Sequence, residues 1–180
     1  MIRGVFLDRD GVINFDDGYT HKFKPIQIIP QIIDVIKYAN HHNYKVVIVT
    51  NQSGIGRGLY TEVDFHKYML DMITFLAGKN AIIEDYFFAP YFKNSLYKKY
   101  RLNENKRKPN IGMICAAQKK YNIDLSNSIL IGDKITDIEA GMRSGIKHNI
   151  LFDSCNLKTT KTKNFTVVSN LCEILTLPIW

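Results

Sequence analysis

The strongest constraint on the fold is a repeated pattern in which a short apolar run ends in small or acidic residues. The runs predicted as strands are Val5–Leu7, Lys45–Thr50, Ile82–Phe88, Ser128–Ile131 and His148–Phe152, with a shorter edge strand at Phe165–Val168. Stretches with helical periodicity lie between or after them, at Gln31–His42, Glu62–Ala77, Ile111–Lys120, Ile135–Ser144 and Leu171–Leu175. Strands that alternate with helices predict an α/β domain with a mainly parallel sheet.

The chain length is that of one domain. It has 180 residues, and we expect residues 1–180 to form a single domain, because domains cluster at about 100–200 residues. No apolar run approaches the roughly 18 residues that span a bilayer. The charge at Asp8 interrupts the N-terminal apolar stretch too early for a signal peptide, so we expect a cytoplasmic protein. The cysteines at positions 115, 155 and 172 form no C-x-x-C pair, and we expect them to be buried apolar fillers.

Two carboxylates follow the first predicted strand. Asp8 and Asp10 project to the same side if the strand conformation continues, at the sheet edge where α/β folds bind ligands. Because like charges repel, the pair requires a cation or a shared proton, and Mg²⁺ prefers such oxygen ligands. A plain Asp-Gly turn is the alternative for this segment taken alone.

The second predicted strand ends in a run that can bind phosphate. Thr50, Asn51 and Ser53 offer hydroxyl and amide groups, and a glycine-rich turn follows. The glycines at 54, 56 and 58 are spaced G-x-G-x-G, which does not match a dinucleotide fingerprint. An ordinary loop is the alternative.

Two further segments could complete such a site. Lys108 precedes Pro109, which can start the next helix, and the Lys108 ammonium could neutralise a phosphate. Asp133 ends the fourth predicted strand and could complete an oxygen-ligand metal site with the first pair. Asp137 lies in the first turn of a predicted helix, where the helix dipole alone favours a carboxylate.

The order of these segments resembles the haloacid-dehalogenase-like phosphatase superfamily. The finer match, which runs from about Ile2 to Phe152, resembles the heptose bisphosphate phosphatases and their relatives, the histidinol-phosphate phosphatases. It rests on the runs Asp8–Asn14, Thr50–Gly54, Arg57–Gly58, Arg107–Pro109 and Gly132–Lys134. The resemblance implies a Rossmann-like, doubly wound, mainly parallel sheet. The short stretch between Asp10 and Thr50 leaves no room for a large cap domain.

The resemblance also implies a mechanism. Asp8 would attack the phosphorus to form an aspartyl-phosphate. Asp10 would protonate the departing sugar oxygen as an acid and then deprotonate the attacking water as a base. The adjacent Asp8 carboxylate would favour the proton that Asp10 needs for this role. Mg²⁺ would be held by Asp8, the Asp10 backbone carbonyl and Asp133. Thr50 and Lys108 would hold the transferring phosphoryl group. The rest of the substrate, with its second phosphate, would be gripped by Asn51, Ser53, Arg57 and Arg107.

One departure from the family concerns zinc. The heptose enzymes typically carry a zinc in the loop before the Arg-Lys-Pro segment, on a C-x-H and a C-x-C pair. The corresponding positions here are Ala89 and Tyr91, then Glu104 and Lys106, so no Cys/His site can form and we predict that zinc is absent. Four aromatic residues are candidates for packing this loop down instead, namely Tyr91, Phe92, Tyr97 and Tyr100.

The predicted activity is Mg²⁺-dependent hydrolysis of a small sugar phosphate, with D-glycero-D-manno-heptose 1,7-bisphosphate converted to the 1-phosphate. Histidinol phosphate or another phosphomonoester is an alternative substrate. The segment Lys93–Lys108 carries +6 of the net charge of +7 and contains aromatic residues, which keeps a nucleic-acid 3′-phosphatase as a rival. A binding module that has lost turnover is a third possibility. We expect a monomer with neither a nucleic-acid nor a membrane partner.

Overall fold

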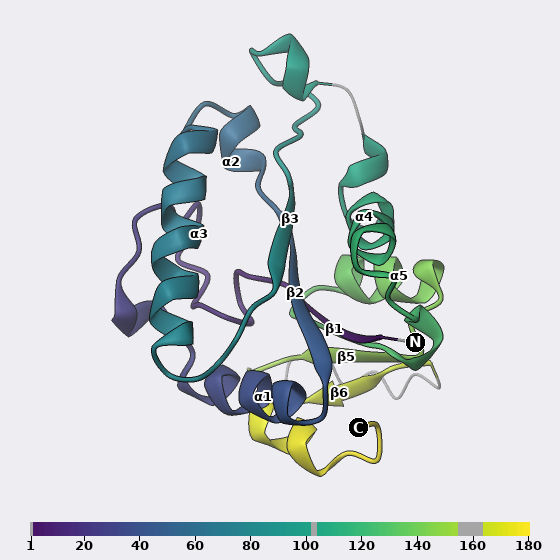
Figure 1. Ribbon diagram of the computed structural model, residues 1–180. Helices are drawn as coiled ribbons and strands as arrows, with labels where there is room; N and C mark the ends of the chain where they lie inside the picture. Colours follow the sequence, from purple (N-terminus) through teal and green to yellow (C-terminus); the bar gives the residue numbers. More distant parts are fainter. Residues whose placement is uncertain (1, 102–103, 155–163) are drawn as a thin grey trace.

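The sheet is parallel and has six strands. The computed structural model describes residues 2–101, 104–154 and 164–180. The strands occur in the order β3-β2-β1-β4-β5-β6, and every pair is parallel. Their bounds are β1 (Arg3–Leu7), β2 (Tyr44–Asn51), β3 (Asp85–Ala89), β4 (Ile129–Gly132), β5 (His148–Phe152) and β6 (Thr166–Val168). The central strand β1 lies between β2 and β4, so the carboxyl ends of these three strands lie side by side (Figure 1).

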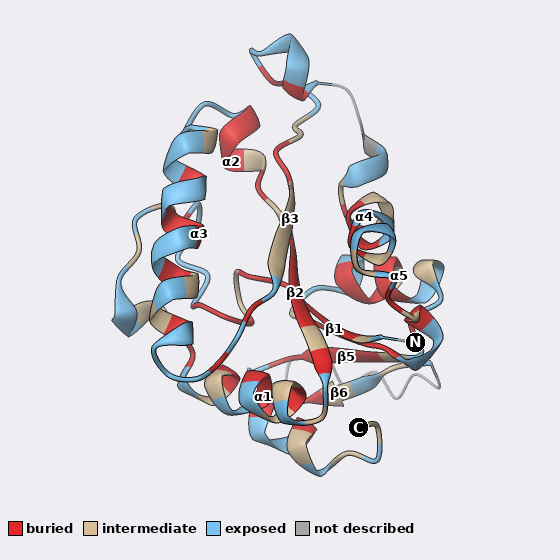
Figure 2. Ribbon diagram, viewed as in Figure 1, coloured by how far each residue is buried: buried red, intermediate tan, exposed pale blue. Residues whose placement is uncertain are grey.

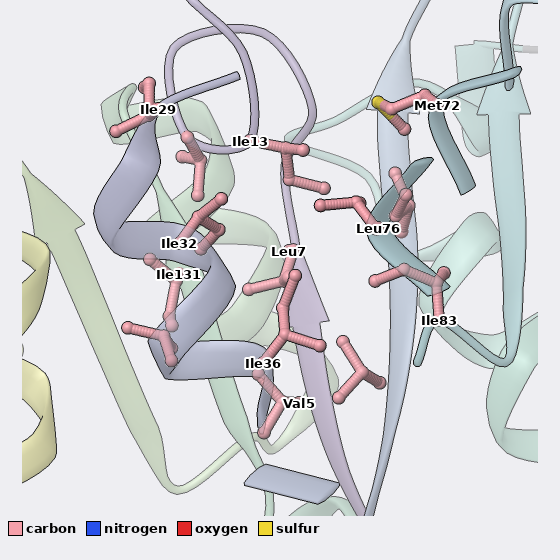
Figure 3. Packing of buried hydrophobic residues seen from close by; sticks show 14 of the residues in the cluster. Val5, Leu7, Ile13, Ile29, Ile32, Ile36, Met72, Leu76, Ile83 and Ile131 are labelled. Carbon is pink, nitrogen blue, oxygen red and sulfur yellow. The ribbon is translucent and has the colours of Figure 1, made fainter. Parts of the chain in front are cut away.

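Helices cover both faces of the sheet. They are α1 (Pro30–His41), α2 (Ser53–Gly56), α3 (Glu62–Ala77), α4 (Gly112–Tyr121) and α5 (Ile135–Ser144). Buried residues of α1 and α3 pack with one face of the sheet, and those of α4 and α5 pack with the other. The buried stripes of these helices face the strands in Figure 2. Figure 3 shows Ile32 and Ile36 of α1 beside Leu7 of β1, with Leu76 of α3 on the far side of Leu7.

Most predicted elements are confirmed to within a few residues. The helices over 62–77 and 135–144 and the strand over 148–152 have the predicted bounds. A capping box begins α3, because Asp64 N–H donates to Thr61 Oγ1 and Thr61 N–H donates to Asp64 Oδ2. Gly145 ends α5 with a φ of +84°, a conformation that glycine adopts without strain.

Several element predictions are wrong. Pro109 does not start the next helix, since α4 begins at Gly112. The expected helix near the C-terminus is a 3-10 helix at Leu171–Thr176, and the third strand begins at Asp85 rather than at Ile82. The short helix α2 was not predicted at all.

The predicted burial of the cysteines is also wrong. Cys115 and Cys172 are exposed, and Cys155 lies outside the described residues. Cys115 lies on the outer side of α4, whose buried stripe is formed by Met113, Ile114 and Ala117. The sequence signal from a single cysteine was therefore too weak to place it.

Two long loops flank the carboxyl edge of the sheet. The loop after β1 contains only a 3-10 turn at Pro25–Gln27 before α1, and no large cap domain is inserted there. The segment after β3 rises beyond the sheet (Figure 1). Its Tyr100 is buried and donates a 2.7 Å hydrogen bond to Glu62 Oε1. Tyr97 is more exposed, and its ring contacts the Tyr100 ring edge to face, with ring centres 6.0 Å apart. Within the described residues, every helix is too short or too polar to span a bilayer.

Candidate active site

A polar pocket of about 600 Å³ lies at the carboxyl ends of β1, β2 and β4. The sheet topology explains its position, because these parallel strands deliver their last residues to one edge. The predicted site residues that line it are Asp8, Asp10, Thr50, Asn51, Ser53, Arg107 and Lys108. Asp137, whose role the sequence left open, lines it as well.

Three carboxylates form a compact cluster beside this pocket. Asp8, Asp133 and Asp137 each offer an oxygen, and these oxygens lie within 4.8 Å of one another. Burial raises the pKa of Asp8 to about 7, against the opposing effect of the Lys108 ammonium. Burial also raises the pKa of Asp133. Burial therefore disfavours the charged forms of Asp8 and Asp133, and a divalent cation with oxygen ligands would offset this effect. The oxygen ligands of the cluster fit Mg²⁺.

Lys108 lies within the same cluster. Its Nζ donates to Asp8 Oδ1 at 2.9 Å, to Asp137 Oδ1 at 2.7 Å and to the Val49 carbonyl oxygen at 2.7 Å. Burial alone would lower the pKa of Lys108, but the carboxylates of Asp8 and Asp137 raise it above its usual value. The pocket therefore contains a fixed positive charge at neutral pH.

The Asp10 carboxylate is surrounded by donors. Arg9, which has no exposed surface, donates from Nε and Nη2 to Asp10 Oδ1 and from Nη2 to Oδ2. Asn14 Nδ2 donates to Oδ1 at 3.0 Å, and Gln52 Nε2 donates to Oδ2 at 3.0 Å. The Arg9 guanidinium is the charged group in direct contact with Asp10, with Nη2 at 2.7 Å from Oδ2. The Asp10 side chain also lies outside the carboxylate cluster.

The residues after β2 have mixed roles. The buried Thr50 hydroxyl accepts a 2.8 Å hydrogen bond from Gln52 Nε2. Both ends of the Asn51 amide bind the backbone of Lys108, since Nδ2 donates to its carbonyl and Oδ1 accepts from its N–H. Asn51 thus ties the Lys108 loop to β2, a role that the sequence did not predict. Ser53 lines the pocket at the start of α2.

Arg57 lies in a neighbouring hollow rather than in the main pocket. This hollow has a volume of about 370 Å³ and is joined to the pocket through Arg107, Lys108 and Pro109, which line both. The Arg57 guanidinium lies 3.7 Å from the centre of the Phe92 ring. Burial and the nearby charge of Arg57 lower the pKa of Arg107. Two guanidinium groups held together in this way would bind an anion favourably.

Sequence reasoning missed three residues of the site. Arg9 stands between the two predicted aspartates, and its buried contact with Asp10 could have been suspected from that position alone. Gln52 lies within the run Thr50–Gly54, which was predicted to bind phosphate, and could have been suspected from its position in the same way. Tyr60, whose hydroxyl donates to Gln52 Oε1 at 2.6 Å, is outside every motif and gave no signal.

The known proteins that this chain resembles are phosphatases. A family model described as polynucleotide kinase 3 phosphatase matches residues 14–170. A D-glycero-alpha-D-manno-heptose-1,7-bisphosphate 7-phosphatase from Burkholderia mallei is 37% identical, covering 96% of this chain and 92% of the relative. A D-glycero-beta-D-manno-heptose-1,7-bisphosphate 7-phosphatase from Haemophilus influenzae is 35% identical, covering 84% of this chain and 82% of the relative.

Solved structures agree on the architecture. A protein from Mesorhizobium loti described as a HAD-like phosphatase superposes with a TM-score of 0.85 at 30% identity, covering 97% of this chain and 84% of that one. The D,D-heptose 1,7-bisphosphate phosphatase from B. bronchiseptica, solved with magnesium and phosphate, has a TM-score of 0.80 at 24% identity, with 97% and 96% covered. The expected Rossmann-like, doubly wound parallel fold is confirmed.

Proposed function

Because this chain belongs to the haloacid-dehalogenase-like phosphatases, as its family match and its heptose bisphosphate phosphatase relatives show, we propose that it hydrolyses a phosphorylated sugar. The proposed reaction removes the C7 phosphate of D-glycero-D-manno-heptose 1,7-bisphosphate and leaves the 1-phosphate. The observation that carries the proposal is the cluster of Asp8, Asp133, Asp137 and Lys108, of which Asp8, Asp137 and Lys108 line the polar pocket, in a chain with these relatives.

The proposed chemistry proceeds in two displacements. An Asp8 oxygen forms a bond to phosphorus while the bond from phosphorus to the sugar oxygen breaks, and Asp10 gives a proton to that oxygen. A water oxygen then forms a bond to phosphorus while the bond from phosphorus to the Asp8 oxygen breaks. Asp10 takes the proton of the water, the Asp8 carboxylate is regenerated, and inorganic phosphate leaves. Lys108 and Thr50 would hold the phosphoryl oxygens, where a fixed charge in a buried site contributes most.

Magnesium is the proposed cofactor. Asp8 and Asp133 are its proposed ligands, with the Asp10 backbone carbonyl, and the proximity of Asp137 to both carboxylates adds it as a candidate. When bound, Mg²⁺ would neutralise the charge of the carboxylates and of the phosphoryl group. Zinc is not part of the proposal, because positions 89, 91, 104 and 106 hold no cysteine or histidine.

Removal of magnesium should abolish turnover. We expect dialysis against a chelator to reduce phosphate release at least about 100-fold, because a bound cation is worth several kcal/mol in such reactions. Added Mg²⁺ should restore the rate, and it should raise the melting temperature of the resting protein because it binds only the folded state. Full activity in protein shown by elemental analysis to be metal-free would contradict the proposal.

A second phosphate would be held at the other end of the substrate. Arg57 and Arg107 lie in the hollow next to the main pocket, at the join through which a bisphosphate would reach both spaces. The repulsion between the two guanidinium groups would be relieved by an anion between them. The proposal is therefore that this hollow receives the phosphate that is not cleaved, with Asn51 and Ser53 near the sugar.

Replacement of Arg107 should separate bisphosphate from monophosphate substrates. For Arg107→Met we expect kcat/KM for the heptose bisphosphate to fall about 10–100-fold, because a charge-assisted hydrogen bond to the second phosphate is lost. The change in kcat/KM for heptose 7-phosphate, which lacks that phosphate, should be much smaller. Lys119→Met removes a positive charge from the exposed side of α4 and is the matched control. Equal losses on both substrates would count against the second phosphate site.

A phosphate-release screen tests the function itself. The panel should contain the α and β anomers of heptose 1,7-bisphosphate, histidinol phosphate, other small phosphomonoesters and a 3′-phosphorylated oligonucleotide. We expect kcat/KM to be highest for a heptose bisphosphate, and phosphorus NMR should show that the 1-phosphate remains. A higher value for another member of the panel would replace the proposed substrate.

The name of the matching family model supports one other candidate, nucleic-acid 3′-phosphatase activity. The basic segment after β3 is exposed at Lys93, Lys98, Lys99 and Arg101, where a nucleic acid could bind. Binding that weakens steeply with salt would favour this candidate, and no binding at low salt would remove it.

We propose instead a monomeric, cytoplasmic enzyme with a sugar substrate, and size-exclusion chromatography with light scattering tests the monomer.

A further inference from the structure

We propose that Gln52, oriented by the Tyr60 hydroxyl, is a positioning residue that holds the Asp10 carboxyl for proton transfer to the leaving oxygen. This inference rests on the proposed function, since it assigns a part of the same reaction. It concerns two residues that neither bind the phosphate nor ligate the metal in the proposed mechanism. Its basis is a chain of hydrogen bonds that begins at Tyr60 and ends at Asp10.

The Asp10 carboxylate is held from two sides. Arg9 and Asn14 reach it from its own strand end and loop, and Arg9 Nη2 also donates to the Thr20 carbonyl oxygen at 2.9 Å. Gln52 reaches it from the residues after β2, with Nε2 at 3.0 Å from Asp10 Oδ2. Gln52 is thus the side chain that connects Asp10 to the part of the pocket proposed to hold the phosphoryl group.

The same Gln52 nitrogen also binds Thr50. Nε2 donates to Thr50 Oγ1 at 2.8 Å, so its two N–H groups serve Asp10 and Thr50 together. Gln52 is only 2% exposed, and water therefore has little access to compete for these bonds. The Gln52 amide consequently holds Asp10, the proposed proton donor, at a fixed distance from Thr50, which is proposed to bind the phosphoryl oxygens.

Tyr60 determines which end of the Gln52 amide faces Asp10. Its hydroxyl donates to Gln52 Oε1 at 2.6 Å, which leaves the NH₂ end to face the two acceptors. The reversed amide would present an oxygen to the carboxylate, which is repulsive. Burial raises the pKa of Tyr60 to about 12, so the hydroxyl keeps its proton at neutral pH.

The packing of Tyr60 is tight enough to hold this geometry. The ring is 6% exposed and stacks on His21, with ring centres 5.1 Å apart. It also lies so close to Gly54 of α2 that a Cβ at that position would collide with the ring. The Tyr60 hydroxyl therefore has little freedom to leave Gln52.

Loss of this positioning should depend on the leaving group. A poor leaving group such as a sugar alkoxide needs a proton as the bond to phosphorus breaks, whereas a nitrophenolate needs almost none. Misplacement of a catalytic group by about 1 Å can cost about 100-fold in rate. A displaced Asp10 should therefore slow alkyl phosphates far more than activated aryl phosphates.

The test is a leaving-group series in single-turnover experiments. Rates of phosphoryl transfer to the enzyme are measured for aryl phosphates of increasing leaving-group pKa, glycerol phosphate and the heptose bisphosphate. For Gln52→Met we expect about 100-fold slower transfer from alkyl phosphates and less than about 3-fold from nitrophenyl phosphate. Tyr60→Phe should show the same selectivity at about 10-fold, because it removes only the bond that orients Gln52.

Tyr68→Phe is the matched control. Tyr68 is also a buried tyrosine, and the Arg9 guanidinium carbon lies 4.6 Å from the centre of its ring. Among the residues that the structure describes, its hydroxyl has no hydrogen-bond partner. Tyr68→Phe should therefore keep the leaving-group dependence of the wild type.

The outcomes separate this inference from the proposed function. If the wild type hydrolyses the series but Gln52→Met and Tyr60→Phe slow all esters equally, or none, the positioning role is overturned. A wild-type protein that releases phosphate from no ester would overturn the proposed function, and this inference with it. Since Tyr60→Phe removes a single oxygen and its melting temperature can be compared with that of Tyr68→Phe, a folding defect would be recognised.

Discussion

Phosphate release should fall at least about 1,000-fold when Asp8 is replaced by asparagine, with the fold retained. The amide is a poor nucleophile, so the proposed aspartyl-phosphate could not form and the proposed hydrolysis by two displacements would be lost. The substitution is nearly isosteric in a position that is 6% exposed. Lys108 keeps its bonds to Asp137 Oδ1 and to the Val49 carbonyl, so the buried ammonium remains compensated.

Two measurements check this expectation. Rapid acid quench followed by mass spectrometry should find a phosphorylated peptide containing Asp8 in the wild type and none in Asp8→Asn. Asp34→Asn, on the exposed side of α1, is the matched control and should be as active as the wild type. Wild-type rates in Asp8→Asn, or a phosphoryl group trapped on another residue, would show that the nucleophile is assigned wrongly.

Periodicity and capping explain why most of the fold could be predicted. The bounds of α3 follow from a stripe of buried residues at Phe65, Met69, Met72 and Leu76, together with the Thr61 capping box. Four residues with two glycines, as in α2, are too few for any periodicity to appear. The apolar pair Ile82 and Ile83 was predicted as the start of β3 but lies before it. Ile83 is buried in the connection that leads to the strand, whereas Ile82 is exposed, so an apolar pair alone does not identify a strand.

The residues of the candidate site that could be predicted are those that lie at the ends of strands. Asp8, Thr50 and Asp133 end or follow parallel strands, and topology alone brings such positions to one edge. Contacts between side chains were not predictable in this way. The spacing of Asp8 and Asp10 suggested a carboxylate pair, but the neighbour of Asp10 is the Arg9 guanidinium, and Asp8 instead lies with Asp133 and Asp137. Side-chain direction at the end of a strand decides between these arrangements.

Lys108→Met should be the most destabilising substitution in the pocket. The Lys108 side chain is only 2% exposed and its Nζ donates to Asp8, Asp137 and the Val49 carbonyl. Methionine has a similar shape but leaves two buried carboxylates without their partner. Breaking a buried ion pair costs about 3–5 kcal/mol, which lowers the melting temperature of a domain of this size by roughly 10 °C or more.

The effect of Lys108→Met should grow with pH. The pKa of Asp8 is raised from 3.8 to about 7 in the folded protein, so the stability linked to its proton is fully present below pH 3.8 and is lost as the pH rises through 7. Because the Lys108 ammonium opposes this shift, its removal raises the pKa of Asp8 further. The difference in unfolding free energy between variant and wild type should therefore be small near pH 4 and largest above pH 7.

Denaturant unfolding of the metal-free protein from pH 4 to 9 measures this difference. Lys134→Met is the control, because the Lys134 side chain is 54% exposed and its contacts with Asp16 at 3.2 Å and Asp133 at 3.5 Å are those of a surface pair, worth about 0–1 kcal/mol. Mg²⁺ should recover part of the stability that Lys108→Met loses above pH 7, because a bound cation compensates the same carboxylates. A loss that is independent of pH, or no larger than that of Lys134→Met, would mean that Lys108 does not compensate the buried charge of Asp8.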